Sequence, residues 1–334
     1  MRYGAPKVQD LASGTRIRKR LRRIGRWIFW IIASLVFLLV LISVLLLYPV
    51  VQTWLAQQLS AKLSKDLGTT IRIERVELRL FGPERLHGVF IADLKGDTLI
   101  AADEIRIRRI RVSLSSHRFS AGRLELYRTR FNLAKAEGDV HSNLTNLLDK
   151  LASADTTSGG ADWRIGCSDV DVRDLHFTYH DGNIEPLPFG VDFDHVDVTK
   201  AFVRGHDLRM AGDSILLGID RIALRDHSGL VLDTLSGNAN VSPRGVRIDD
   251  LLLSTPGTRL RGDLALLTDS FADFSEFTTR VRLKIDLATS HVQFSDIALF
   301  APDLKGMDLP VRVAGHVRGT VAELRGRGMD IGIG

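Results

Sequence analysis

Residues 71–78 read IRIERVEL, and in this stretch apolar side chains alternate with charged ones except at the Glu74-Arg75 pair, where two charged residues stand together. Alternation with a period of two is typical of a β-strand that has one dry face and one wet face. The stretch therefore predicts an amphipathic strand whose alternation skips one residue. With Φ for an apolar and x for a non-apolar residue, the pattern is Φ-x-Φ-x-x-Φ-x-Φ.

This template recurs along the chain more often than the roughly one match that chance predicts at this composition. Allowing an apolar residue at the last x adds three relaxed copies. The strict copies begin at Ile71, Ile105, Val170 and Val191, and the relaxed copies begin at Leu217, Val246 and Val292. The recurrence predicts a mainly β fold, a long curved sheet of antiparallel type with one or two short helices.

Each skipped residue has two explanations that the sequence leaves open. A β-bulge inserts one extra residue and keeps the apolar side chains on one face, so repeated bulges curl a sheet toward that face. Alternatively, each skip is a corner or short loop between two strands. Hairpin loops are predicted at residues 93–96 and 226–229, of the form Asp-x-x-Gly, and at Asp181-Gly182, because Gly accepts the positive φ of such turns.

Two segments depart from the strand pattern. Residues 52–68 place Leu55, Leu59, Leu63 and Leu67 at i, i+4 spacing, which predicts an amphipathic helix whose apolar stripe lies on a membrane surface or plugs one end of the strands. Residues 139–160 predict a short helix followed by a turn-rich linker. Around them we expect a first β segment at 69–138 and a second at 161–334, the latter continuing beyond residue 334.

The N-terminal residues predict a membrane anchor. Residues 27–51 carry no charge, and a bilayer core of about 30 Å needs roughly 20 apolar helical residues. A cleaved signal peptide would have a shorter apolar region followed by a small-x-small cleavage site. We therefore predict a single transmembrane helix, with aromatic residues at both of its ends. Its anchoring residues are Trp27, Trp30, Leu38, Leu41 and Tyr48.

The charge distribution orients this anchor. Residues 1–26 hold nine Lys and Arg against the single acid Asp10, so the tail carries +8 and, with a formal total of +5, the rest of the chain sums to −3. A mildly acidic body does not offer the basic face that nucleic acids need, so we expect no nucleic-acid partner. The positive-inside rule places the tail in the cytoplasm and the bulk of the chain outside it, which in a bacterium is the periplasm.

The apolar faces of at least ten strands need a cover that two short helices cannot supply. The sheet can pack on a second sheet, close into a filled barrel, or curl into a groove occupied by an apolar ligand. An ordinary packed core is the commonest solution, but a membrane anchor favours the groove because it holds the chain beside lipid. The groove would be lined by Ile71, Ile73, Val76, Ile105, Ile107, Ile110, Val191, Phe193, Val196, Ile222 and Leu224.

The sequence carries no signature of catalysis: G-x-S-x-G, H-E-x-x-H, G-x-x-x-x-G-K-[ST] and G-x-G-x-x-G are all absent. We therefore predict no enzyme activity, no catalytic residues, no cofactor and no metal. His176 and His180 share a strand face but lack a further ligand, and the aspartates of residues 192–197 fit a solvated face better than a calcium site. Cys167 is the single cysteine, which excludes an internal disulfide, and we expect it to be a small buried residue.

Taken together, these features resemble the N-terminal region of the AsmA-like proteins, and among these the TamB branch. The resemblance is carried by the basic tail, the single span, the Leu-rich helix ending at Leu67-Gly68, and residues 71–80, 86–94, 96–102, 105–114, 142–148 and 315–324. It implies an inner-membrane anchored periplasmic protein with a taco-shaped β-groove that conducts phospholipid toward the outer membrane. It also implies, as an alternative, a factor for outer-membrane protein insertion that acts with an Omp85-class partner.

Three hypotheses follow for the apolar face. In a lipid conduit, a charge placed at Ile107 or Val196 blocks transport while the protein still folds. In an assembly module, exposed strand edges template client strands, and prolines on an edge strand matter more than charges in the groove. In a passive scaffold with a filled sandwich core, the same charges unfold the protein.

Overall fold

The computed structural model describes residues 48–79, 82–113, 115–154, 163–301 and 304–333, together with residues 34, 35, 37, 38 and 41. The chain divides into two compact units, residues 1–52 and 53–334.

The first unit contains the predicted tail and span. The tail and most of residues 27–51, including Trp27 and Trp30, lie outside the described residues. Leu38 and Leu41 are helical, and both are exposed, as is Tyr48. Within the described part of the chain, no helix combines the length and apolar character that a membrane crossing requires.

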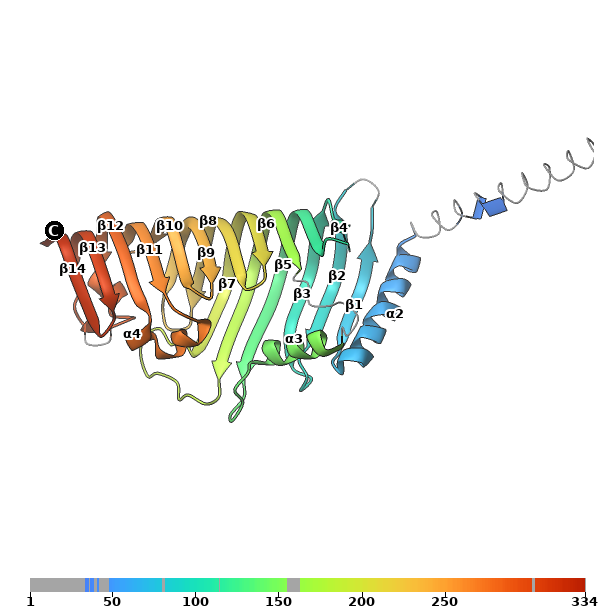
Figure 1. The fold of residues 1–334 in the computed structure, drawn as a ribbon, viewed down its shortest axis with the longest axis horizontal. Helices are drawn as coiled ribbons and strands as arrows, with labels where there is room; N and C mark the ends of the chain where they lie inside the picture. Colours follow the sequence, from blue (N-terminus) through green and yellow to red (C-terminus); the bar gives the residue numbers. More distant parts are fainter. Residues whose placement is uncertain are drawn as a thin grey trace, which may run out of the picture. The chain divides into compact units, whose positions relative to one another are not determined.

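The second unit is built on one large, mixed, curved sheet, in which neighbouring strands follow one another from β1 to β14 (Figure 1). The short strand β4 pairs only with β5 and stands beside this path. The strands are β1 (Ile71–Glu77), β2 (Glu84–Ala92), β3 (Thr98–Arg108), β4 (Arg111–Ser113), β5 (Arg118–Lys135), β6 (Arg164–Asp181), β7 (His195–Ala211), β8 (Ser214–Asp226), β9 (Val231–Ser242), β10 (Gly245–Ser254), β11 (Arg259–Leu267), β12 (Arg282–Gln293), β13 (Pro310–Thr320) and β14 (Glu323–Ile333).

The expected antiparallel pairing needs one correction, because β5 and β6 run parallel. A parallel pair requires a crossover connection, and here the crossover contains α3 (Asn143–Ala154). Asn143 fixes the start of α3 to β5: its Oδ1 accepts from the Ala134 N–H at 3.0 Å, and its Nδ2 donates to the Asn132 carbonyl at 3.2 Å. The helix and linker predicted at 139–160 therefore interrupt one continuous sheet.

The skipped residues do not all have the same structural origin. Bulges account for the copies at Val170, Leu217 and Val246; in the last, the register to β11 shifts between Ile248 and Leu251, and Asp250 has φ 55°. In the copy at Ile105 the skip is a corner between β3 and β4. In the copy at Ile71 the register to β2 is unbroken.

Many of these irregularities lie next to one another in neighbouring strands and form a line across the sheet, which we call the crease. Its members have positive φ, and the pairing registers on either side of them bring them together from strand to strand. The crease comprises Gly88, Arg128, Asp174, Lys200, Gly237, Asp250, Gly262, Gly315 and Gly328. Because each strand changes phase at the crease, its apolar residues stay on one face on both sides of it.

Two template copies are not strands over their full length, contrary to prediction. Val191 and Phe193 lie in the loop before β7, where the Val191 N–H donates to the Leu299 carbonyl at 2.7 Å. The copy at Val292 ends β12 and continues into the single-turn helix α5 (Phe294–Ile297). In both cases contacts distant in sequence outweigh the local alternation.

The predicted turns at residues 93–96 and 226–229 form hairpins, with Gly96 at φ 94° and Gly229 at φ 93°. At Asp181-Gly182 the expected turn forms, with the Ile184 N–H donating to the Asp181 carbonyl at 3.2 Å, but it does not close a tight hairpin. Gly182 has no positive φ, and a loop of residues 182–194 joins β6 to β7. Gly182 instead packs closely on the connection after β5, where its N–H donates to the Lys135 carbonyl at 2.7 Å.

The remaining helices are peripheral to the sheet. They are α2 (Pro49–Leu67), of which Thr53 onward belongs to the second unit, the 3-10 helix η1 (Phe271–Glu276), and the single turn α4 (Phe277–Arg280). The prediction of one or two short helices therefore undercounts the short turns. Few large apolar side chains are fully covered: among the described residues, Leu99 and Val281 are the ones at 0% exposure.

Candidate functional site

The candidate site is the apolar face of the sheet, on which cross-strand partners line up into continuous rows. Each member of a row is the direct register partner of the next, on the neighbouring strand, so the row runs perpendicular to the strands. The first row comprises Val76, Leu86, Ile105, Leu126, Val172, Val203, Ile222, Leu235, Leu253 and Leu260. It is unbroken by any polar residue from β1 to β11.

Two further rows flank the first. One crosses β1 to β7 and includes the Phe131–Phe177 pair, whose ring centroids are 5.8 Å apart; its members are Ile71, Ile91, Ile100, Phe131, Phe177 and Val198. The other continues to β14 through Phe119, Ile165, Met210, Ile215, Val241, Val246, Leu266, Leu283, Gly319 and Leu324. Together the rows give the sheet one apolar face along its length.

This face is not completely covered. In the first row Val76 and Val172 are buried, and the other members keep part of their surface accessible. All the described strands belong to the one sheet, so no separate second sheet of described strands lies over its apolar face. A filled sandwich, in which inner-face residues interdigitate and become fully buried, does not describe this arrangement.

Near β9 to β14 the face deepens into a cavity of about 460 Å³. Its lining is almost wholly apolar and includes Leu253 and Leu260, the last two members of the first row, so row and cavity are continuous. One wall is formed by Ile297 and Phe300 of the segment around α5. At the margin the Thr255 hydroxyl donates to Asp296 Oδ2 at 2.6 Å, which satisfies the polar groups there.

Most of the residues predicted to line a groove lie on this face. Val76, Ile105 and Ile222 share the first row, Ile71 begins the second, and Ile73 pairs with Val89 between them. The others on the face pair with apolar partners or sit beside the rows: Ile107 opposite Leu124, Val196 opposite Tyr179, Leu224 opposite Leu232, and Ile110 at the β3–β4 corner.

Val191 and Phe193 are the exceptions, because they belong to the β6–β7 loop instead of a strand. Phe193 is 69% exposed and stacks on Phe300 with centroids 6.3 Å apart, so it lies near the wall of the cavity. Sequence reasoning predicted β structure here but missed the template copy in β5, where residues 119–126, FSAGRLEL, fit the strict template when Ala counts as apolar. That count would have identified Leu124 and Leu126.

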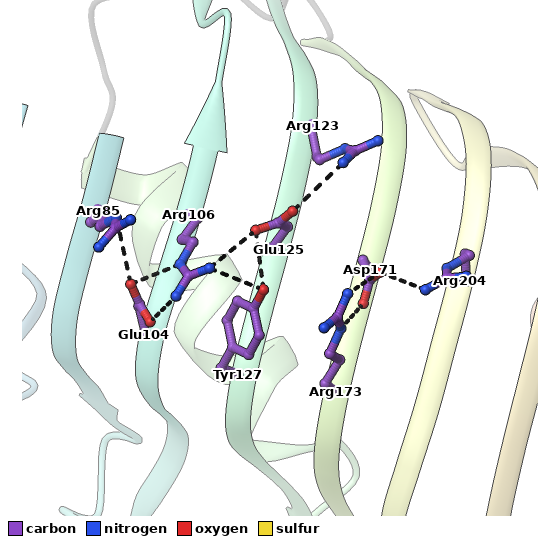
Figure 2. Close-up of polar contacts among 9 residues, drawn as sticks. All are labelled: Arg85, Glu104, Arg106, Arg123, Glu125, Tyr127, Asp171, Arg173 and Arg204. Carbon is purple, nitrogen blue, oxygen red and sulfur yellow. Dashed lines mark hydrogen bonds and ion pairs between the residues drawn. The ribbon is translucent and has the colours of Figure 1, made fainter. Parts of the chain in front are cut away.

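The opposite face carries charge, arranged as a network across β2, β3, β5, β6 and β7 (Figure 2). Arg106 pairs with Glu104 at 2.8 Å and reaches Glu125 at 3.8 Å, and its guanidinium lies over the Tyr127 ring at 4.5 Å. The hydrogen bond from Arg106 holds the pKa of Glu104 below its ordinary value of 4.5.

Asp171 forms the second centre of this network. It accepts from Arg173 Nε at 2.7 Å and from Arg204 Nη2 at 3.2 Å, and these hydrogen bonds, Arg173 first, lower its pKa from the ordinary 3.8. Tyr127 sits between the two centres, where burial and the nearby negative charge of Glu125 raise its pKa. Since the charges neutralise one another, this face fits a solvated outer surface.

The other polar candidates have structural partners. His176 Nε2 contacts Asp197 Oδ1 at 2.8 Å, so His176 does not share a site with His180. His180 lies against His195 with ring centroids 4.7 Å apart, and Asp192 holds the β6–β7 loop by accepting from the backbone of Leu187 and Asp194. Among the described residues, no group of three His, Cys, Asp or Glu side chains is placed to hold a metal ion.

A scan against models of protein families, a search of curated proteins and a search of solved structures each found no match to this chain. The case for a function therefore depends on the apolar face and on the sequence pattern.

Proposed function

We propose that this chain is part of an AsmA-like, TamB-type envelope protein, anchored in a bacterial inner membrane with its bulk in the periplasm, that conducts phospholipid toward the outer membrane along its apolar face. The observation that carries the proposal is the first row, ten apolar residues paired across ten neighbouring strands without a polar interruption. Acyl chains are the apolar cover that a membrane-anchored chain meets at highest concentration.

The length of the row favours a path over a single binding pocket. Nine strand spacings of about 4.8 Å make the row roughly 43 Å long. Half of a hydrocarbon core of about 30 Å gives an acyl chain an extent of roughly 15 Å, so the row is nearly three times that length. A groove of this kind, taco-like in section, offers successive positions to an acyl chain while its headgroup stays in water.

The test compares two neighbouring residues of β8 that lie on opposite faces. Ile222→Asp places a charge in the first row, and Ala223→Asp places the same charge on the other face. The full chain is purified from a bacterial envelope, and bound lipid is measured by native mass spectrometry and extraction. We expect phospholipid to co-purify in defined stoichiometry with the unchanged chain and Ala223→Asp, and to be lost from Ile222→Asp. A lipid-free unchanged chain, or equal loss in both variants, would refute the proposal.

The alternative is a factor for outer-membrane protein insertion that acts with an Omp85-class partner. The observation in its favour is the exposure of apolar side chains on β14, where Ile331 is 63% and Ile333 76% exposed. Client strands bind exposed strands by β-augmentation. Under this alternative, Asp330→Pro on β14 abolishes insertion of a client while Ile222→Asp leaves it intact.

A further inference from the structure

Helix α2 covers the edge of the sheet with its polar side. β1 is an edge strand, and two hydroxyls of α2 satisfy its outward backbone groups. The Thr53 hydroxyl accepts from the Val76 N–H at 3.1 Å and lies 3.4 Å from the Val76 carbonyl. The Ser64 hydroxyl does the same at the other end of β1. It accepts from the Ile71 N–H at 2.8 Å and lies 3.2 Å from the Ile71 carbonyl.

The apolar side of α2 consequently points away from the sheet. Trp54 is 58% exposed, Leu55 52%, Leu59 58% and Leu63 38%, whereas Ser60 on the inner side is 5% exposed. This reverses the usual arrangement, in which a surface helix buries its apolar stripe on the core. Leu67, the last residue of the predicted stripe, is 3% exposed, but the other members do not plug the sheet, and exposed apolar side chains on one side of a helix mark a contact site.

The position of the stripe in the chain identifies its partner. The uncharged residues 27–51 run directly into α2, so the stripe begins within a few residues of a segment suited to a membrane. Trp54 prefers the headgroup level, and Lys62, exposed on the same side, suits anionic headgroups. The chain itself therefore holds the stripe beside a membrane, whereas nothing in the chain would hold it beside a protein partner.

We propose that the apolar stripe of α2, comprising Trp54, Leu55, Leu59 and Leu63, lies in the surface of the phospholipid bilayer and holds the β1 edge of the sheet against it. This inference rests on the membrane anchoring in the proposed function and is independent of lipid transfer along the sheet. It gives α2 two contacts at once, hydroxyls to the sheet edge and apolar side chains to the membrane.

The experiment uses Trp54 as its own probe. The full chain carrying Trp27→Phe, Trp30→Phe and Trp163→Phe is placed in nanodiscs of phospholipid brominated near the headgroup end of its acyl chains. Because an interfacial helix sits about 5–10 Å into the headgroup and acyl boundary, Trp54 should lose roughly half or more of its emission relative to unbrominated nanodiscs. The matched control retains Trp163 and carries Trp54→Phe, and its emission should not change.

Leu59→Glu in the single-tryptophan chain should restore most of the emission, since it places a charge in the stripe at an exposed position that folding does not need. Unquenched but blue-shifted Trp54 emission would show a protein partner and overturn the inference, and so would emission typical of water. Failure of the chain to join nanodiscs would overturn it as well. Quenched Trp54 in a chain that binds no lipid along β1–β11 would instead refute only the proposed function.

Discussion

Gly262 is the crease residue whose substitution best tests whether the close approach of neighbouring strands stabilises the fold. Its φ is 149°, and a Cβ there would lie 1.9 Å from the Asp286 carbonyl oxygen on β12. The backbone strain of a non-Gly residue in this region is about 1–3 kcal/mol. Relieving the clash requires opening the pairing of Gly262 with Leu287, which forfeits one or two hydrogen bonds of about 0.5–1.5 kcal/mol each. Because Ala restricts the unfolded chain more than Gly does, the substitution also offsets about 0.4–1 kcal/mol of this destabilisation.

Gly262→Ala should therefore destabilise the fold by about 2–4 kcal/mol, which shifts a urea midpoint by about 1 M at a slope near 3 kcal/mol/M. Gly229→Ala is the control, because Gly229 also has positive φ, 93°, but nothing lies within 4 Å of its added Cβ. Gly229→Ala should therefore destabilise the fold by backbone strain alone, by about 1 kcal/mol net. Equal midpoints for the two variants in equilibrium unfolding would show that close strand approach at the crease does not matter.

Two further predictions concern titratable groups. Burial raises the pKa of the Cys167 thiol, so Cys167 should react with a maleimide more slowly than a free peptide thiol does at neutral pH, and should match it once the chain is unfolded in urea. Asp171 has a folded pKa below its ordinary 3.8, so the unfolded chain takes up its proton first as the pH falls. Its contribution to stability is complete above pH 3.8 and is lost below it; urea midpoints measured against pH should therefore fall less steeply in acid for Asp171→Asn, and identical slopes would contradict this.

The strand pattern could be read from sequence because it is local. Alternation and its skip depend on a few successive residues, and a bulge such as Asp249-Asp250 is written into the strand that contains it. Two things escaped that reading. The parallel β5–β6 pair depends on α3 crossing between strands, and the loop position of Val191 depends on Leu299, more than a hundred residues away. Periodicity cannot encode either contact.

The rows could not be predicted from the sequence for a related reason. A template identifies which side of one strand is apolar, but a row exists only when registers across many strands bring those positions into line. The crease supplies that alignment: because the phase changes at neighbouring points of adjacent strands, Ile105 on β3 stays opposite Leu126 on β5, and Leu126 stays opposite Val172 on β6. Most of the residues predicted as lining thus lie on the apolar face, whereas the continuity of the rows is a property of the sheet.

The two proposals meet at one residue. Val76 is the first member of the first row, and it is also the residue whose backbone Thr53 of α2 engages. Between α2 and β1 lies a cavity of about 350 Å³ lined in part by Ile71 and Ile73, which begin the apolar face at this end. A helix resting in the bilayer surface would therefore set the start of the row at the membrane. An acyl chain would then pass from the bilayer to the apolar face without crossing the charged face, where Arg106 binds Glu104 and Arg173 binds Asp171. Under the two proposals together, α2 would stand at the entrance of the lipid path, and the row would give the length of that path.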